Sequence, residues 1–126
     1  MRMEDWPVTM RTFLRRRRME RERALQELHE RAAAQAGDVV KLIGQRYRPR
    51  RIIQWGSVLH PERFREYSDI DIAVEGITDP QLFFRLVADA ERLTTFPLDI
   101  VQLELIEPAY RALILRKGAV VYECPQ

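Results

Sequence analysis

The sequence predicts an α/β or α+β domain in which helices pack on a small mixed sheet and a long helix forms the N-terminal part. Apolar residues at helical spacing dominate the first part of the chain. Short β-rich segments then alternate with helical segments, and Gly and Pro residues separate them. With 126 residues, the chain is long enough for one domain with a buried core. We expect an N-terminal helical region over residues 1–47, which packs on or extends from a core over residues 48–126.

The N-terminal region is expected to be helical almost without interruption. Residues 7–9 resemble a helix start, with Thr9 as the N-cap. Gly37 and Asp38 are expected to bend the helix, or to end it so that Asp38 caps a second one. Pro49 cannot continue a helix. The apolar stripe along this helix contains Ala24, Leu25, Leu28, Ala32, Val39, Leu42 and Ile43.

Strands and helices alternate in the remainder of the chain. We expect strands at residues 51–55, 70–75, 98–103 and 119–123, and helices at residues 81–93 and 108–117. A polar loop from about residue 58 to residue 67 joins the first two strands, and Gly118 is expected to cap the last helix. A helix connects the second strand to the third, so these two strands should be parallel.

Three aspartates lie at the starts of two predicted strands. Asp69 and Asp71 alternate with Ile70 and Ile72, so both carboxylates point to one face of the sheet. Asp99 has the same setting in the third strand, and parallel neighbours begin at the same edge. Repelling carboxylates are tolerated best when a cation neutralises them. A ligand set of oxygens alone suits Mg²⁺ or Mn²⁺ rather than zinc.

Gly56 and Ser57 follow the first strand. If the first two strands pair antiparallel, this dipeptide lies beside the aspartates. Glycine lets a backbone approach a phosphate, which a serine hydroxyl and nearby N–H groups can bind. Each motif alone is common in turns and on surfaces, but the three together, in this order, indicate a metal and nucleotide site.

The positive charge of the chain is unevenly distributed. The net charge is only +2, yet residues 15–18 are an unbroken run of arginines. A second cluster contains Arg46, Arg48, Arg50 and Arg51. Such clusters can bind RNA phosphates or an acidic partner. The alternative for the first run is a solvated helix face whose arginines pair with Glu20, Glu22 and Glu27.

A cytoplasmic protein without a membrane span is expected. No segment approaches the roughly 18 apolar residues that a span needs, and no secretory signal is recognisable. Cys124 is the single cysteine, which suits a reducing compartment. His29 and His60 are expected on the surface. The residues expected in the core are Trp55, Phe83, Phe84, Leu86 and Val87.

Three segments of the chain resemble the signature of the DNA polymerase β-like nucleotidyltransferase superfamily. They are Trp55-Gly56-Ser57, residues 68–74 and residues 98–101. Within the superfamily the chain resembles the minimal nucleotidyltransferases of bacteria and archaea, from about residue 22 to residue 123. This resemblance implies a polymerase β-like nucleotidyltransferase fold for the core.

The resemblance also implies a role for each motif. Asp69 and Asp71 would hold two divalent metal ions, and Asp99 would complete one metal site and assist deprotonation of the attacking hydroxyl. Gly56 and Ser57 would hold the triphosphate of ATP or another NTP. The reaction would be in-line transfer of a nucleotidyl group, AMP foremost, to a protein or RNA acceptor, with pyrophosphate leaving.

The loop after Ser57 departs from the family pattern. Residues 58–68 make one residue more than is usual, and His60-Pro61 stands where many relatives carry Arg-Gly. This change concerns triphosphate binding and not the metal carboxylates.

Minimal nucleotidyltransferases often act as antitoxins of HEPN-domain proteins, and some add AMP to a tyrosine of the toxin. The resemblance therefore implies an HEPN-domain partner, with the N-terminal helix as its docking surface. One alternative is a catalytically weak or inactive antitoxin that neutralises this partner by direct contact. Another is a helix-mediated homo-oligomer that binds RNA through Arg15 to Arg18.

Overall fold

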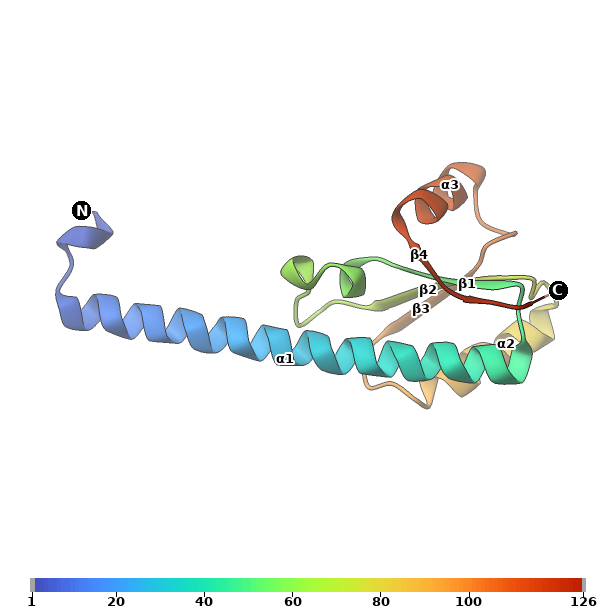
Figure 1. Cartoon of the computed structure of the whole chain (residues 1–126), viewed down its shortest axis with the longest axis horizontal. Coiled ribbons are helices and arrows are strands. Elements are labelled where there is room, and N and C mark those ends of the chain that lie inside the picture. Colours follow the sequence, from blue (N-terminus) through green and yellow to red (C-terminus); the bar gives the residue numbers. More distant parts are fainter. Residues whose placement is uncertain (1, 126) are drawn as a thin grey trace.

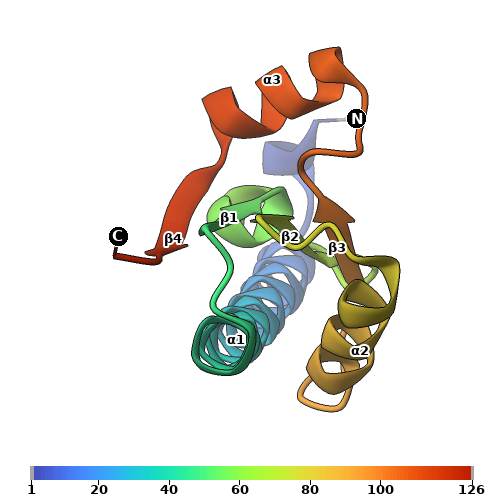
Figure 2. The ribbon, with the colours of Figure 1, turned by 90° about the vertical axis from the view of Figure 1, so that its right-hand side faces the viewer.

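Residues 2–125, which the computed structural model describes, fold into a four-stranded mixed sheet with helices on both faces (Figures 1 and 2). The strands are β1 (Arg51–Trp55), β2 (Ile70–Glu75), β3 (Leu98–Gln102) and β4 (Ala119–Glu123). The α-helices are α1 (Val8–Tyr47), α2 (Pro80–Glu91) and α3 (Pro108–Lys117), and the 3₁₀ turns are η1 (Met3–Asp5), η2 (Ser57–Leu59) and η3 (Pro61–Arg63). The architecture is mixed α+β, as the sequence predicts. Met1 and Gln126, the outer ends of the two expected regions, lie outside the described residues.

The sheet has the order β3-β2-β1-β4. β1 pairs antiparallel with both β2 and β4, whereas β2 and β3 are parallel neighbours. The crossover through α2 imposes the parallel pairing. The predicted parallel orientation of β2 and β3 is confirmed, and the antiparallel pairing of β1 with β2, on which the placement of Gly56-Ser57 depended, is observed. The end of β1 and the starts of β2 and β3 therefore lie at one end of the sheet.

The two faces of the sheet bury separate apolar clusters. On one face, Ile52, Ile70 and Ile72 pack against α1 and α2. On the other face, Ile53 and Ala73 pack with Ile114 of α3. Alternation along each strand therefore assigns neighbouring residues to opposite layers, and Figure 2 shows α3 on the opposite side of the sheet from α1 and α2.

α1 differs from the expected helix in two details. It runs through Gly37 and Asp38 without a break, because the packing of flanking residues such as the fully buried Val39 outweighs the roughly 1 kcal/mol cost of a helical glycine. Pro7 occupies the cap position instead of Thr9, and no side chain caps the helix start. The helix ends before Pro49, as expected.

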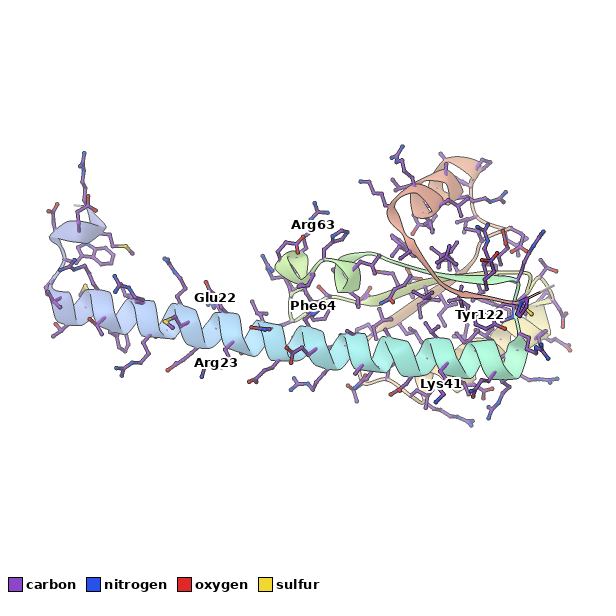
Figure 3. The ribbon with its side chains drawn as sticks, in the orientation of Figure 1. Glu22, Arg23, Lys41, Arg63, Phe64 and Tyr122 are labelled. Carbon is purple, nitrogen blue, oxygen red and sulfur yellow. The ribbon has the colours of Figure 1, made fainter. Side chains whose placement is uncertain are left out.

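Only the C-terminal half of α1 packs on the sheet. The helix has 40 residues, which corresponds to about 60 Å at 1.5 Å per residue. Its buried residues all lie between Ala32 and Gly44. The N-terminal half projects away from the sheet (Figure 1), and Glu22 and Arg23 lie on this projecting part in Figure 3. Its exposed apolar side chains are Val8, Met10, Phe13 and Met19.

The arginine run of α1 is exposed on this projecting half. Arg17 lies over the Phe13 ring, with 5.8 Å from the guanidinium carbon to the ring centroid. Within residues 2–125, no ion pair joins this run to Glu20, Glu22 or Glu27. The expected pairing is therefore absent from the described part of the chain, and the run is a free basic surface. No described helix is apolar enough over the necessary length to cross a membrane.

Phe84 is a further correction, since it is 77% exposed rather than part of the core. The side of α2 that packs on the sheet is defined by Leu86 and Ala90, which are fully buried. Phe84 precedes Leu86 by two positions, which places it on the opposite side of a helix with 3.6 residues per turn.

Candidate active site

The predicted site residues lie in or directly beside the ends of three adjacent strands, at one end of the sheet. In the strand register, Trp55 at the end of β1 pairs with Asp71, and Asp71 pairs with Asp99 of β3. Adjacent strands are about 4.8 Å apart. A hydrogen bond of 2.9 Å from the Ile70 N–H to the Pro97 carbonyl oxygen holds the start of β2 beside the start of β3. The structure thus brings Asp71 and Asp99 to neighbouring positions.

These carboxylates lie on the face of the sheet that α3 covers. Ala73 follows Asp71 at a two-residue interval, and Ala73 belongs to the cluster beneath α3. Tyr110 of α3 packs edge-on against Trp55, with 5.5 Å between ring centroids. Trp55 is half-buried against this cluster, in partial agreement with its expected place in the core.

Asp71 is the most buried of the three aspartates, and its charge is unfavourable there. Burial, followed by repulsion from Asp99 and then from Asp69, raises the pKa of Asp71 from its ordinary 3.8 to about 7. Asp69 and Asp99 are exposed. Burial also raises the pKa of Tyr110, and the charges of Asp99 and Asp71 raise it further. The site therefore concentrates negative charge that a cation would relieve.

The carboxylate of Asp71 and the backbone conformation at position 56 together require a glycine there. Its φ is +82°, a conformation that residues with side chains rarely adopt. A Cβ atom at position 56 would lie 2.3 Å from Oδ2 of Asp71. The prediction assigned this glycine to a close approach of phosphate, and the structure adds that its missing side chain makes room for Asp71.

The chemistry of the donor set fits a hard divalent cation, because all three candidate ligands are carboxylates. In the side-chain arrangement of residues 2–125, however, no group of three or more His, Cys, Asp or Glu residues is positioned to hold a metal ion. Asp69 and Asp99 are exposed, and exposed side chains change rotamer within nanoseconds. A bound cation would therefore require these two side chains to turn towards Asp71.

The long loop after Ser57 is compact. It forms η2 and η3, and buried Ser68 closes it by accepting a 2.9 Å hydrogen bond from the Arg65 N–H. His29 of α1 lies half-buried against this loop, with 2.7 Å between Nε2 and the Val58 carbonyl oxygen. His29 was expected on the surface. That prediction is wrong, because the face of α1 that carries His29 packs against the loop.

A cavity of about 270 Å³ opens beside the aspartates. Its lining comes from the end of β1, the loop and α3, and consists of Trp55, Gly56, Ser57, His60, Arg63, Leu113 and Lys117. Sequence reasoning missed Arg63 and Lys117. Arg63 could have been found from the sequence, because it is the first arginine after Gly56-Ser57. No sequence pattern could have found Lys117, because only the packing of α3 over the sheet brings it to this place.

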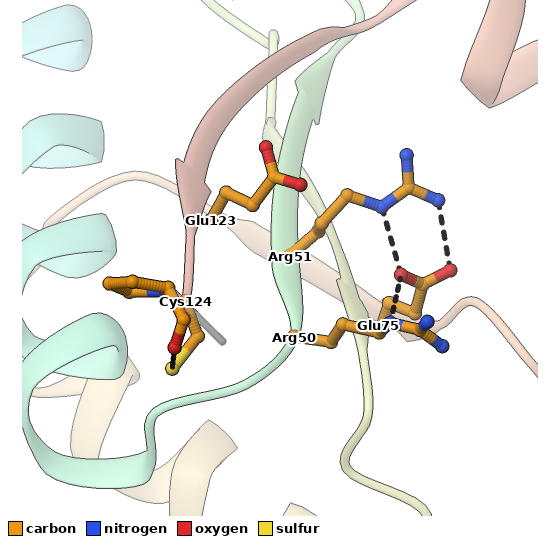
Figure 4. Close-up of a pocket in the computed structure, with 6 residues that line it drawn as sticks. Arg50, Arg51, Glu75, Glu123 and Cys124 are labelled. Atoms are coloured by element: carbon orange, nitrogen blue, oxygen red, sulfur yellow. Dashed lines mark hydrogen bonds and ion pairs between the residues drawn. The ribbon is translucent and has the colours of Figure 1, made fainter.

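A larger cavity, of about 730 Å³, lies at the other end of the sheet (Figure 4). Arg51 and Glu75 line it and form two hydrogen bonds, of 2.8 and 2.9 Å. The bond from Arg51 is the main reason why the pKa of Glu75 is lowered. Arg51 and Trp55 are the two ends of β1, so this cavity is remote from the aspartates. Its lining is balanced in charge, because it contains the two arginines Arg50 and Arg51 and the two glutamates Glu75 and Glu123.

The spatial arrangement of these residues, rather than a relationship to a known protein, is what supports a function. No protein family model matches the chain, and no curated protein matches it in sequence. The meeting of Asp71 and Asp99 beside Gly56 is therefore the observation from which the chemistry is inferred.

Proposed function

We propose that this chain is a metal-dependent nucleotidyltransferase of the minimal, polymerase β-like type. The observation that carries the proposal is the pairing of Asp71 with Asp99 across two parallel strands, next to Gly56. Negative side chains at such a place make a site for a divalent cation and the phosphates that accompany it. The substrate is ATP or another NTP. The transferred group is a nucleotidyl group, with AMP as the first candidate.

Asp69, Asp71 and Asp99 are the residues that would hold Mg²⁺ or Mn²⁺. The bound ion supplies neutralisation of phosphate charge, which is the main requirement of phosphoryl chemistry. Asp99 is exposed, so an acceptor hydroxyl can approach it and transfer its proton to this carboxylate. Gly56 keeps the strand end clear for the donor phosphates, and pyrophosphate is the leaving group.

The acceptor is a protein or an RNA, and the partner is proposed to be an HEPN-domain toxin for which this chain is the antitoxin. The projecting half of α1 supports a partner, because Val8 and Phe13 are 66% and 57% exposed there. Apolar side chains on a helix without neighbours provide a docking surface for another protein.

The proposal is tested by incubating the chain with labelled ATP, Mg²⁺ and the protein encoded by the adjacent gene. We expect label on the partner, and at least about a 100-fold lower rate for Asp71→Asn and Asp99→Asn, because each removes transition-state stabilisation. Asp38→Asn is the matched control, since Asp38 is an exposed aspartate on α1 outside the site. Absence of labelling, with Asp71→Asn still neutralising the partner, would contradict an enzymatic role.

Neutralisation by direct contact is the second candidate function, and the exposed apolar residues of α1 favour it. In this case Phe13→Asp and Met19→Asp would abolish neutralisation, whereas Asp71→Asn would leave it intact. Both apolar residues are more than half exposed, so these substitutions should leave the fold unchanged. Circular dichroism and a partner pull-down separate a lost contact from a lost fold.

A further inference from the structure

We infer that the cavity lined by Arg63 and Lys117 binds the terminal phosphates of the nucleotide, and that these two side chains hold them. The nucleotide as a substrate rests on the proposed function. The binding of a polyphosphate in this cavity does not, because it requires no turnover.

The cavity gathers positive groups from separate parts of the chain. Arg63 ends η3, and Lys117 ends α3. Both line the cavity together with Gly56 and Ser57. Figure 3 shows Arg63 on the side of the loop that faces away from α1. These two residues supply positive charge in a chain that has His60-Pro61 where many minimal nucleotidyltransferases carry Arg-Gly.

The two cations have no acidic partner among residues 2–125, since the ion pairs found there do not include Arg63 or Lys117. The cavity at the other end of the sheet differs, because Glu75 already neutralises Arg51 there. An anion is therefore the ligand that fits the cavity beside Gly56, and phosphate groups are the anions that arginine and lysine bind well.

The size of the cavity indicates which part of a nucleotide it takes. Its volume of about 270 Å³ is below the roughly 300–1,000 Å³ of cavities that enclose a whole ligand. It therefore suits terminal phosphates rather than a complete nucleotide. Gly56 lines the cavity and also lies against Asp71, so a polyphosphate held there would direct its reacting phosphate towards the aspartates.

The inference is tested by the binding of inorganic tripolyphosphate, measured by isothermal titration calorimetry on the full chain at about 150 mM salt, which screens unspecific charge effects. We expect Arg63→Gln and Lys117→Gln each to weaken binding about tenfold, as expected for the loss of one charge-assisted contact. Arg116→Gln is the matched control, because Arg116 is an exposed arginine next to Lys117 that does not line the cavity. Lys117→Arg should keep most of the affinity.

Unchanged binding in both glutamine variants would overturn the inference, and so would an equal loss in Arg116→Gln or a wild-type chain that binds no tripolyphosphate. These outcomes are separate from the labelling experiment. If the variants lose tripolyphosphate binding but the wild type transfers no label, the cavity assignment holds and the proposed function fails. If labelling depends on Asp71 but both variants bind normally, the reverse is true.

Discussion

The two ends of the sheet differ in whether their partly buried charges are paired with opposite charges. At one end Arg51 and Glu75 pair through two hydrogen bonds, and the pKa of Glu75 is lowered. At the other end Asp71 is surrounded by like charges, and its pKa is raised to about 7. Paired charges stabilise the folded chain, whereas crowded carboxylates destabilise it until a cation arrives. The contrast indicates that the charge at one end contributes to stability, whereas the charge at the other end opposes it.

The strongest test of this contrast is Gly56→Ala. A Cβ would collide with Oδ2 of Asp71 at 2.3 Å and would be strained at φ +82°. We expect a loss of about 2–4 kcal/mol in the free energy of unfolding, measured by urea denaturation, together with loss of label transfer. Gly37→Ala is the control, because nothing lies within 4 Å of its Cβ position on α1. It should stabilise the chain by about 0.5–1 kcal/mol.

Opposite effects on stability are expected from neutralising one carboxylate at each end. In EDTA at pH 8, Glu75→Gln should lower the free energy of unfolding by about 1–2 kcal/mol, since Arg51 loses its partner. Asp71→Asn should raise it by about 1–2 kcal/mol, because repulsion and desolvation are relieved. Solvent screens both half-buried groups, which limits the size of each effect. Effects of the same sign at both ends would contradict the comparison.

The smallest expected effect is on the pH dependence of stability without metal. The folded chain binds a proton at Asp71 up to about pH 7, whereas the unfolded chain releases it near the ordinary value of 3.8. This contribution to stability is therefore lost as pH rises from about 4 to about 7. Glu75, whose pKa is lowered from 4.5, contributes stability that is lost as pH falls below that value.

Urea denaturation of the wild type and Asp71→Asn at pH 5 and pH 8 measures the Asp71 part. The variant should lack the decline between these values, and adding Mg²⁺ to the wild type at pH 8 should restore stability by binding the ionised carboxylates. A wild type whose stability is equally insensitive to Mg²⁺ and to Asp71→Asn would show that Asp71 carries no unfavourable charge.

Local patterns were sufficient for most of the fold. The alternation of residues 69–72 predicted which side chains share a face, because a strand has a period of two. The helix between β2 and β3 predicted their parallel pairing. These rules depend only on neighbours in sequence and on chain connectivity, and they predicted that Asp71 and Asp99 start parallel strands at the same edge of the sheet. The direct pairing of the two strands was an additional condition, which the observed strand order meets.

Features decided by packing were not accessible in the same way. The helix α1 continues through Gly37 because contacts of its flanking residues with the core outweigh the local preference of glycine. Packing also selects which side of α2 faces the sheet, and Phe84 lies on the other side. His29 was misassigned for the same reason, since its partner Val58 is distant in sequence.

The sequence by itself therefore determined that Asp69 and Asp71 share one face and that β2 and β3 are parallel, because these follow from strand period and crossover direction. The tertiary structure decided that β2 and β3 are direct neighbours. Only the tertiary structure decided how crowded Asp71 is and why residue 56 must be glycine. It also decided that Arg63 and Lys117 meet in one cavity beside the pair. The physical reason is that charge repulsion, steric exclusion and cavity lining depend on distances between segments far apart in the chain, and a one-dimensional pattern does not contain these distances.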